Sequence, residues 1–133
     1  MVSFYPYAES VRQGKIVAKT SDTISNIGDL EMPIKMYYTV SSSAKTINIG
    51  LSPEDGSTKS LSLSNVVKAG NDWGICVDMK THLVEGVNNR LEKTGNLYNR
   101  YITSGDFFMV PVGLNTLTSN TSWNQVTFNY LYY

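Results

Sequence analysis

The sequence predicts an all-β protein folded as an antiparallel β-sandwich. Apolar side chains recur at every second position along most of the chain, which is the spacing of strands with one buried face. Turn residues separate these runs about every 8–12 positions or a little more, as in sandwiches and barrels. A helical period of about 3.6 residues is not convincing anywhere in the chain.

The alternating runs are the expected strands. They lie at residues 34–40, 46–51, 61–65, 73–79 and 126–133. In the first run Ile34, Met36 and Tyr38 share one face, and Lys35 and Tyr37 share the other. Because most of these runs have one largely polar face, we expect sheets with one side in the core and one side in water.

The last run, 126–133, combines aromatic residues with a lack of charge. An exposed edge of that kind is prone to aggregate, so we predict a central or partnered strand. Val2–Tyr7 has a similar character and is expected to pair near it, which would bring the termini to one side.

Turns are predicted where glycine follows or precedes Asp or Asn. The strongest signal is Pro53–Gly56, followed by 70–72, 86–89 and 95–96. The only helix candidates are short, at 64–68 or 87–91. Because neither a repeat nor a linker divides the chain, residues 1–133 are predicted to form one sandwich domain.

The composition argues against several classes of partner. Lys plus Arg and Asp plus Glu both number 11, so no net charge attracts nucleic acid or an anionic membrane. The first residues do not form a signal peptide, and no apolar stretch reaches the roughly 18 residues of a membrane span. We therefore expect a protein made in a cytoplasm, with no nucleic-acid partner and no membrane insertion.

The single cysteine, Cys76, and single histidine, His82, are a possible nucleophile and base. The favoured alternative is that Cys76 is a small buried hydrophobe, because it lies between Ile75 and Val77. Apolar burial raises the pKa of a thiol and lowers its reactivity.

Two acidic pairs are candidates for a chemical site. Glu54 and Asp55 lie in a predicted turn, where adjacent carboxylates are expected to point apart and are poorly placed to act on one bond. Asp72 and Asp78 would be separated by about 20 Å in an unbroken strand, which is too far to act together. We expect Asp72 to be a turn residue and Asp78 a solvated or hydrogen-bonded strand residue. The sequence therefore predicts no enzyme activity, no cofactor and no metal site.

Aromatic side chains give the best general binding signal, with nine Tyr and two Trp. Tyr and Trp combine a flat apolar face with a polar tip, which suits both sugars and protein partners. The candidates for saccharide or partner contact are Trp73, Trp123, Tyr98 and Tyr101, with Tyr37 as a further exposed candidate. Packing in the core is the alternative for each of them.

Three segments resemble the carboxy-terminal domain of siphophage distal tail proteins. Asn26-Ile-Gly-Asp-Leu-Glu-Met-Pro33 is similar to an N-x-G-D…P segment that leads into a strand. Gly70-Asn-Asp-Trp-Gly-Ile-Cys-Val-Asp78 is similar to a polar turn into a strand that ends in Asp. Ser104-Gly-Asp-Phe-Phe-Met-Val-Pro-Val-Gly-Leu-Asn-Thr116 is similar to a G-D-F-F…P-x-G-x-N-T segment. The resemblance runs in order from about Asn26 to Tyr133.

This resemblance implies a galectin-like jelly-roll sandwich. It also implies a structural component of a phage or prophage tail tip or baseplate, located in the virion tail and bound to other tail proteins. The alternative is a carbohydrate-binding module that contacts a host-surface saccharide. Whole distal tail proteins also carry an amino-terminal belt domain that forms a hexameric ring. This sequence has no room for that domain, so the resemblance does not imply that this chain forms a ring.

Overall fold

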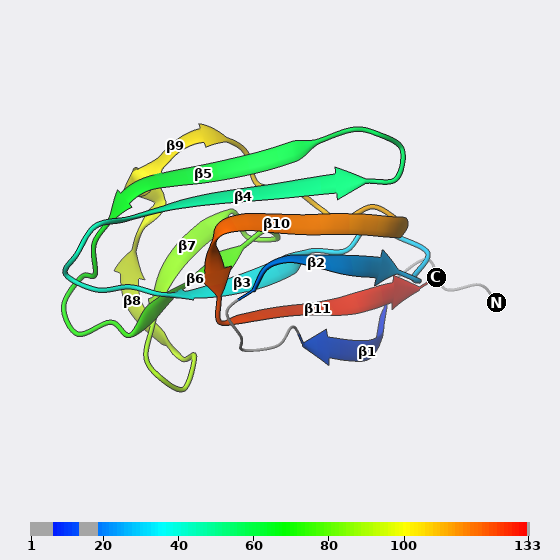
Figure 1. Ribbon diagram of the computed structural model, residues 1–133. Helices are drawn as coiled ribbons and strands as arrows, with labels where there is room; N and C mark the ends of the chain where they lie inside the picture. Colours follow the sequence, from blue (N-terminus) through cyan, green and yellow to red (C-terminus); the bar gives the residue numbers. More distant parts are fainter. Residues whose placement is uncertain (1–6, 14–18, 133) are drawn as a thin grey trace.

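The computed structural model describes residues 7–13 and 19–132, with side chains from residue 20 onward. In this range the chain forms two antiparallel sheets that pack face to face (Figure 1). The predicted all-β sandwich is confirmed. A single turn of 3-10 helix, η1 (Asn99–Tyr101), is the only helix in the described range.

One sheet has six strands in the order β1-β11-β3-β6-β7-β8. Their bounds are β1 Tyr7–Gln13, β11 Gln125–Tyr132, β3 Ile34–Thr39, β6 Gly74–Asp78, β7 Leu83–Val87 and β8 Lys93–Leu97. The other sheet has five strands in the order β2-β10-β4-β5-β9. Their bounds are β2 Lys19–Asn26, β10 Gly113–Trp123, β4 Lys45–Pro53, β5 Lys59–Val66 and β9 Ile102–Gly105.

The core lies between the two sheets and is built from alternate residues of the strands. In β3, Ile34, Met36 and Tyr38 are fully buried, as their spacing predicts. In β4, Ile47 and Leu51 fill the corresponding positions from the opposite sheet. One contiguous cluster of buried side chains joins both sheets. β6 departs from the pattern, because all of its residues are buried on both faces.

The predicted runs at 34–40, 46–51, 61–65, 73–79 and 126–133 all correspond to strands, within one to three residues at most ends. β11 lies between β1 and β3, so the prediction of a partnered final strand is also confirmed. Its partner β1 pairs Tyr7 with Tyr132 and continues to Gln13. The strand beside β11 is therefore 7–13, and residues 2–6 of the predicted segment lie outside the described residues.

Several elements differ from the prediction. The short helices expected at 64–68 and 87–91 are wrong, because Ser64–Val66 belong to β5 and Val87 ends β7. The loop expected at 95–96 is part of β8. Strands β2, β7, β8, β9 and β10 were not predicted, because most of them are short or rich in Ser, Thr and Asn.

No helix in the described part of the chain is both long and apolar enough to cross a membrane.

Candidate functional site

Two of the predicted contact residues are core residues. Trp123 is 2% exposed and Tyr98 is 0% exposed. Trp123 falls on the inward parity of β10, together with Leu117. Tyr98 follows β8, and its ring turns inward so that its hydroxyl meets Asp72. The prediction of exposed contacts is wrong for Trp123 and Tyr98, because strand parity and a buried hydrogen bond place both rings inside.

The other predicted contact residues are partly buried. Tyr101 lies beside Tyr98, with their ring centroids 5.9 Å apart. The guanidinium carbon of Arg100 lies 4.7 Å from the centroid of the Tyr101 ring, which is a cation–π contact. The backbone of Trp73 is held by Val87 and Val40 on its two sides. The structure therefore brings Tyr98 and Tyr101 together, but one of these two rings is inaccessible.

Asp72 is 4% exposed and is the centre of a polar network that holds β8 in the sheet. Thr94 Oγ1 donates to its carboxylate at 2.7 Å and the Tyr98 hydroxyl at 2.6 Å. Asn96 Nδ2 donates to both carboxylate oxygens, at 3.2 and 3.1 Å. A Cβ at Gly86 would overlap this carboxylate, so only glycine leaves it room. Asp72 is in a turn as predicted, but its role is to fasten β8.

These contacts decide the protonation of the network. Burial raises the pKa of Asp72, but the hydrogen bonds from Tyr98, Thr94 and Asn96 outweigh burial, and the net pKa is lowered. Burial and the hydrogen bond to Asp72 raise the pKa of Tyr98 to about 12. The folded protein therefore holds an ionised carboxylate and a neutral phenol.

Cys76 is 2% exposed and lies opposite Tyr37 on the outer side of β6 and β3. Burial raises the pKa of the Cys76 thiol to about 11. His82 instead stacks on Phe107, with ring centroids 4.9 Å apart. The prediction that Cys76 is a small buried residue is confirmed. In the described range, no group of three or more His, Cys, Asp or Glu side chains could hold a metal ion.

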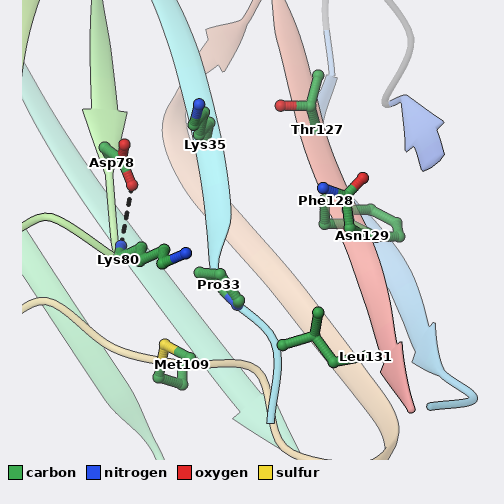
Figure 2. A pocket seen from close by; sticks show the side chains of 9 residues that line it. All are labelled: Pro33, Lys35, Asp78, Lys80, Met109, Thr127, Phe128, Asn129 and Leu131. Atoms are coloured by element: carbon green, nitrogen blue, oxygen red, sulfur yellow. Dashed lines mark hydrogen bonds between the residues drawn. The ribbon is translucent and has the colours of Figure 1, made fainter. Parts of the chain in front are cut away.

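A groove of about 420 Å³ opens on the outer side of the six-stranded sheet, around the start of β3 (Figure 2). It combines apolar walls with charged and amide groups from β3, β6, β11 and the segment before β10. The lining residues are Pro33, Lys35, Asp78, Lys80, Met109, Thr127, Phe128, Asn129 and Leu131. Asp78 is buried at one side, where its Oδ1 accepts the backbone N–H groups of Lys80 at 2.9 Å and Thr81 at 3.4 Å. The expectation of a hydrogen-bonded strand residue at Asp78 is confirmed.

The outer side of the five-stranded sheet has a different character, which we call the hydroxyl face. Residues opposite each other in an antiparallel pair share one face. The pairings place on this face Ser21, Thr23, Ser25, Asn48, Gly50, Ser52, Ser60, Ser62, Ser104, Leu114, Thr116 and Thr118. None of these positions carries a charge or an aromatic ring. The face therefore has no ring on which a sugar could stack.

Residues of the first and third resembling segments have structural roles at the end of the sandwich. Asn26 donates from Nδ2 to the carbonyl groups of Leu30 and Val110, both at 3.0 Å. Its Oδ1 accepts the N–H group of Gly28. A Cβ at Gly28 would lie 2.6 Å from the carbonyl oxygen of Leu131, so this close approach requires glycine. The turn after β2 is thereby fixed against β11.

Asn115 has a similar role in β10. Its Nδ2 group donates to the carbonyl groups of Pro111 and Gly113, both at 3.0 Å. It also reaches the carbonyl of Ile24 in β2 at 3.4 Å. The Asn and Gly positions of these segments therefore connect β2, β10 and β11 and shape the fold.

No pattern in the sequence predicts the groove directly. Lys35 and Thr127 were on the outward parity of predicted strands, which was the available sign that they face solvent. The strand order is needed to see that the same groove is also lined by Lys80, Met109 and Leu131.

No protein-family model and no curated protein matches this sequence. Among solved structures, the chain is similar to the crystal structure of SPP1 Dit (gp 19.1), described as a paradigm of the hub adsorption apparatus in phages that infect Gram-positive bacteria. The TM-score is 0.67 at 13% sequence identity, over 96% of this chain and 48% of SPP1 Dit. The chain therefore has the fold of about half of SPP1 Dit, which confirms in fold the resemblance to a domain of distal tail proteins.

Proposed function

We propose that this protein is a structural component of a phage or prophage tail tip, which presents its sandwich to neighbouring tail or baseplate proteins. The observation that carries the proposal is the similarity in fold to SPP1 Dit over 96% of the chain. The three motifs in the sequence resemble the same family, so two separate lines of argument support the proposal. Location in the virion tail and binding to other tail proteins belong to the same proposal.

The proposal is limited to one appended domain. The chain spans about half the length of SPP1 Dit, so the proposal does not include the formation of a hub by this chain. Fold alone does not determine function, and a sandwich supports many roles. What the sandwich offers to partners is its two outer sheet surfaces, the groove on one and the hydroxyl face on the other.

No observation favours the carbohydrate-binding alternative. Saccharide sites combine an exposed aromatic ring with converging polar groups. Trp123 and Tyr98 are buried, and the hydroxyl face carries no ring. A titration with host cell-wall polysaccharide, followed by tryptophan fluorescence, is expected to leave the emission of the protein unchanged.

The proposal is tested on particles purified from cells that carry the gene. We expect mass spectrometry to find the protein in the particles, and immunogold labelling to place it at the tail end distal to the capsid. Particles from a strain with a stop codon in the gene provide the control for antibody specificity. Absence of the protein from purified tails, or label spread over the capsid, would overturn the proposal.

A further inference from the structure

The groove around Pro33 exists because a strand ladder stops there. β11 pairs with β3 from Gln125 opposite Tyr37 to Phe128 opposite Ile34. The next residue on the β3 side is Pro33, which has no N–H group to continue the ladder. Its neighbour Met32 pairs instead with Val110, through backbone hydrogen bonds of 3.0 and 2.8 Å. On this side β11 is next contacted at Leu131, whose carbonyl oxygen accepts the Asp29 N–H group at 2.8 Å. The groove lies where the two chain segments separate before this contact.

The groove has an apolar wall and a cationic rim. Leu131, Met109 and Pro33 supply apolar surface. Figure 2 shows Lys35 rising from β3 and the Lys80 side chain extending from the end of β6 toward Pro33. A volume of about 420 Å³ falls in the range of small-ligand sites, which is roughly 300–1,000 Å³. The space fits one or two side chains of a bound segment.

The charges of the lining residues favour an anion. Two lysines and one aspartate give a formal balance of +1, that is +2 from Lys35 and Lys80 and −1 from Asp78. Asp78 opposes an anion, but its Oδ1 already accepts two backbone N–H groups. The ammonium groups are on exposed residues and are free to turn toward a ligand. The Asn129 side chain adds an amide donor at the same rim.

We propose that this groove binds a partner polypeptide segment in which a carboxylate side chain lies next to an apolar one. The carboxylate meets Lys35 and Lys80, and the apolar side chain packs on Leu131 and Met109. The identity of the partner as a neighbouring tail protein rests on the proposed function, whereas the chemistry of the groove stands by itself. A protein absent from tails could still bind such a segment, so the two proposals fail separately.

The test is a titration of the ¹⁵N-labelled full chain with two probes, acetyl-Leu-Glu-Leu-amide and acetyl-Leu-Gln-Leu-amide, followed by NMR amide shifts. We expect the Glu peptide to shift the amides of Lys35, Lys80 and Asn129 and to bind about threefold to tenfold more tightly than the Gln peptide. This ratio corresponds to about 0.7–1.4 kcal/mol in total, which is within the range expected for two exposed ion pairs. Equal affinity for the two peptides, or shifts confined to other surfaces, would overturn the proposal.

Variants and a second probe sharpen the test. The double variant K35Q/K80Q is expected to lose the preference for the Glu peptide, while Lys68→Gln, an exposed lysine that does not line the groove, is expected to keep it. A preference that survives in K35Q/K80Q contradicts the assignment. Inorganic phosphate alone is expected to cause no comparable shifts. If phosphate reproduces the peptide shifts, the groove is an anion site that ignores the apolar wall, and the proposal is wrong.

Discussion

A single buried carboxylate, Asp72, holds the edge strand β8 against the rest of its sheet. β8 has the sequence Lys-Thr-Gly-Asn-Leu and buries almost nothing, so apolar packing does not hold it in place. Its Thr94 and Asn96 side chains reach Asp72 instead. An ionised acceptor roughly doubles the strength of such bonds. Hydrogen bonds to this one carboxylate therefore stabilise the position of a strand that has no apolar face to bury.

Replacement of Asp72 by Asn is expected to lower the free energy of unfolding by about 2–3 kcal/mol. The change removes the charge and turns one acceptor into a donor that faces other donors. Urea denaturation at pH 7 measures the loss. Glu31→Gln removes an exposed carboxylate and serves as control, with an expected change within about 0.5 kcal/mol. Equal stability of the two variants would contradict the role of Asp72.

The same residue predicts a dependence on pH. Its pKa in the folded chain lies below the ordinary value of 3.8, so ionisation favours the folded state. This contribution is complete above the ordinary pKa and is lost as the pH falls through the folded pKa. Comparison of wild type with Asp72→Asn from pH 7 to pH 3 is expected to show their difference in unfolding free energy shrinking with acid. A constant difference would show that the pKa of Asp72 is the same in the folded and the unfolded chain, and would contradict its lowering by the hydrogen bonds.

Cys76 is expected to be unreactive in the folded protein. Its thiol is buried and its pKa is raised to about 11, so very little thiolate is present at pH 8. Reaction with a disulfide reagent, followed by absorbance, is expected to be at least about 100-fold slower than in the chain unfolded with guanidinium. Similar rates in the two states would show that the thiol is accessible.

At the scale of single elements, alternation separates the two faces of each strand even where apolar residues are few. In β10, Leu117 and Ser119 point into the core, while Thr116 and Thr118 lie on the hydroxyl face. The buried Ser119 hydroxyl is accommodated because the Tyr38 hydroxyl donates to it at 2.8 Å. A strand with polar residues on both faces can therefore lie inside a sheet, here between β2 and β4.

A pair of neighbouring substitutions in β10 tests this reading. Leu117→Ala is expected to cost about 2–5 kcal/mol, because it leaves a cavity at a fully buried position. Thr116→Ala is expected to cost less than about 1 kcal/mol, because it changes only an exposed side chain. Chemical denaturation of both variants gives the comparison, and a reversed order would contradict the assigned faces.

For the whole molecule, one cluster of buried side chains joins the two sheets. The chain passes between the sheets repeatedly, so neither sheet is completed by one continuous segment. The consecutive strands β1 and β2 lie in different sheets, and so do β3 and β4 (Figure 1). Because each sheet buries its inner face on the other, we expect the sheets to unfold together.

Scanning calorimetry is expected to show one transition whose calorimetric and van 't Hoff enthalpies agree. For 133 residues the enthalpy near 60 °C is expected to be about 90 kcal/mol, at about 0.7 kcal/mol per residue. Two resolved transitions would contradict the prediction that residues 1–133 form one domain.

Local sequence patterns are enough to predict the fold class and the core faces of the strongly alternating strands. Ile34, Met36 and Tyr38 are buried as their spacing requires, because side chains in a strand alternate between two faces regardless of the neighbours. The turn at Pro53–Gly56 follows from residues that tolerate its backbone angles. Both predictions depend only on residues that are near in sequence.

The order of the strands in each sheet, and the contacts that this order produces, are seen only in the three-dimensional structure. Asp72 is buried because donors more than twenty residues later reach it. Tyr98 turns inward for the same reason, against the expectation of an exposed ring. The groove forms because Pro33 faces β11, where a missing N–H group ends a ladder. Periodicity encodes the burial of a side chain but not its partner, and these features depend on the partner.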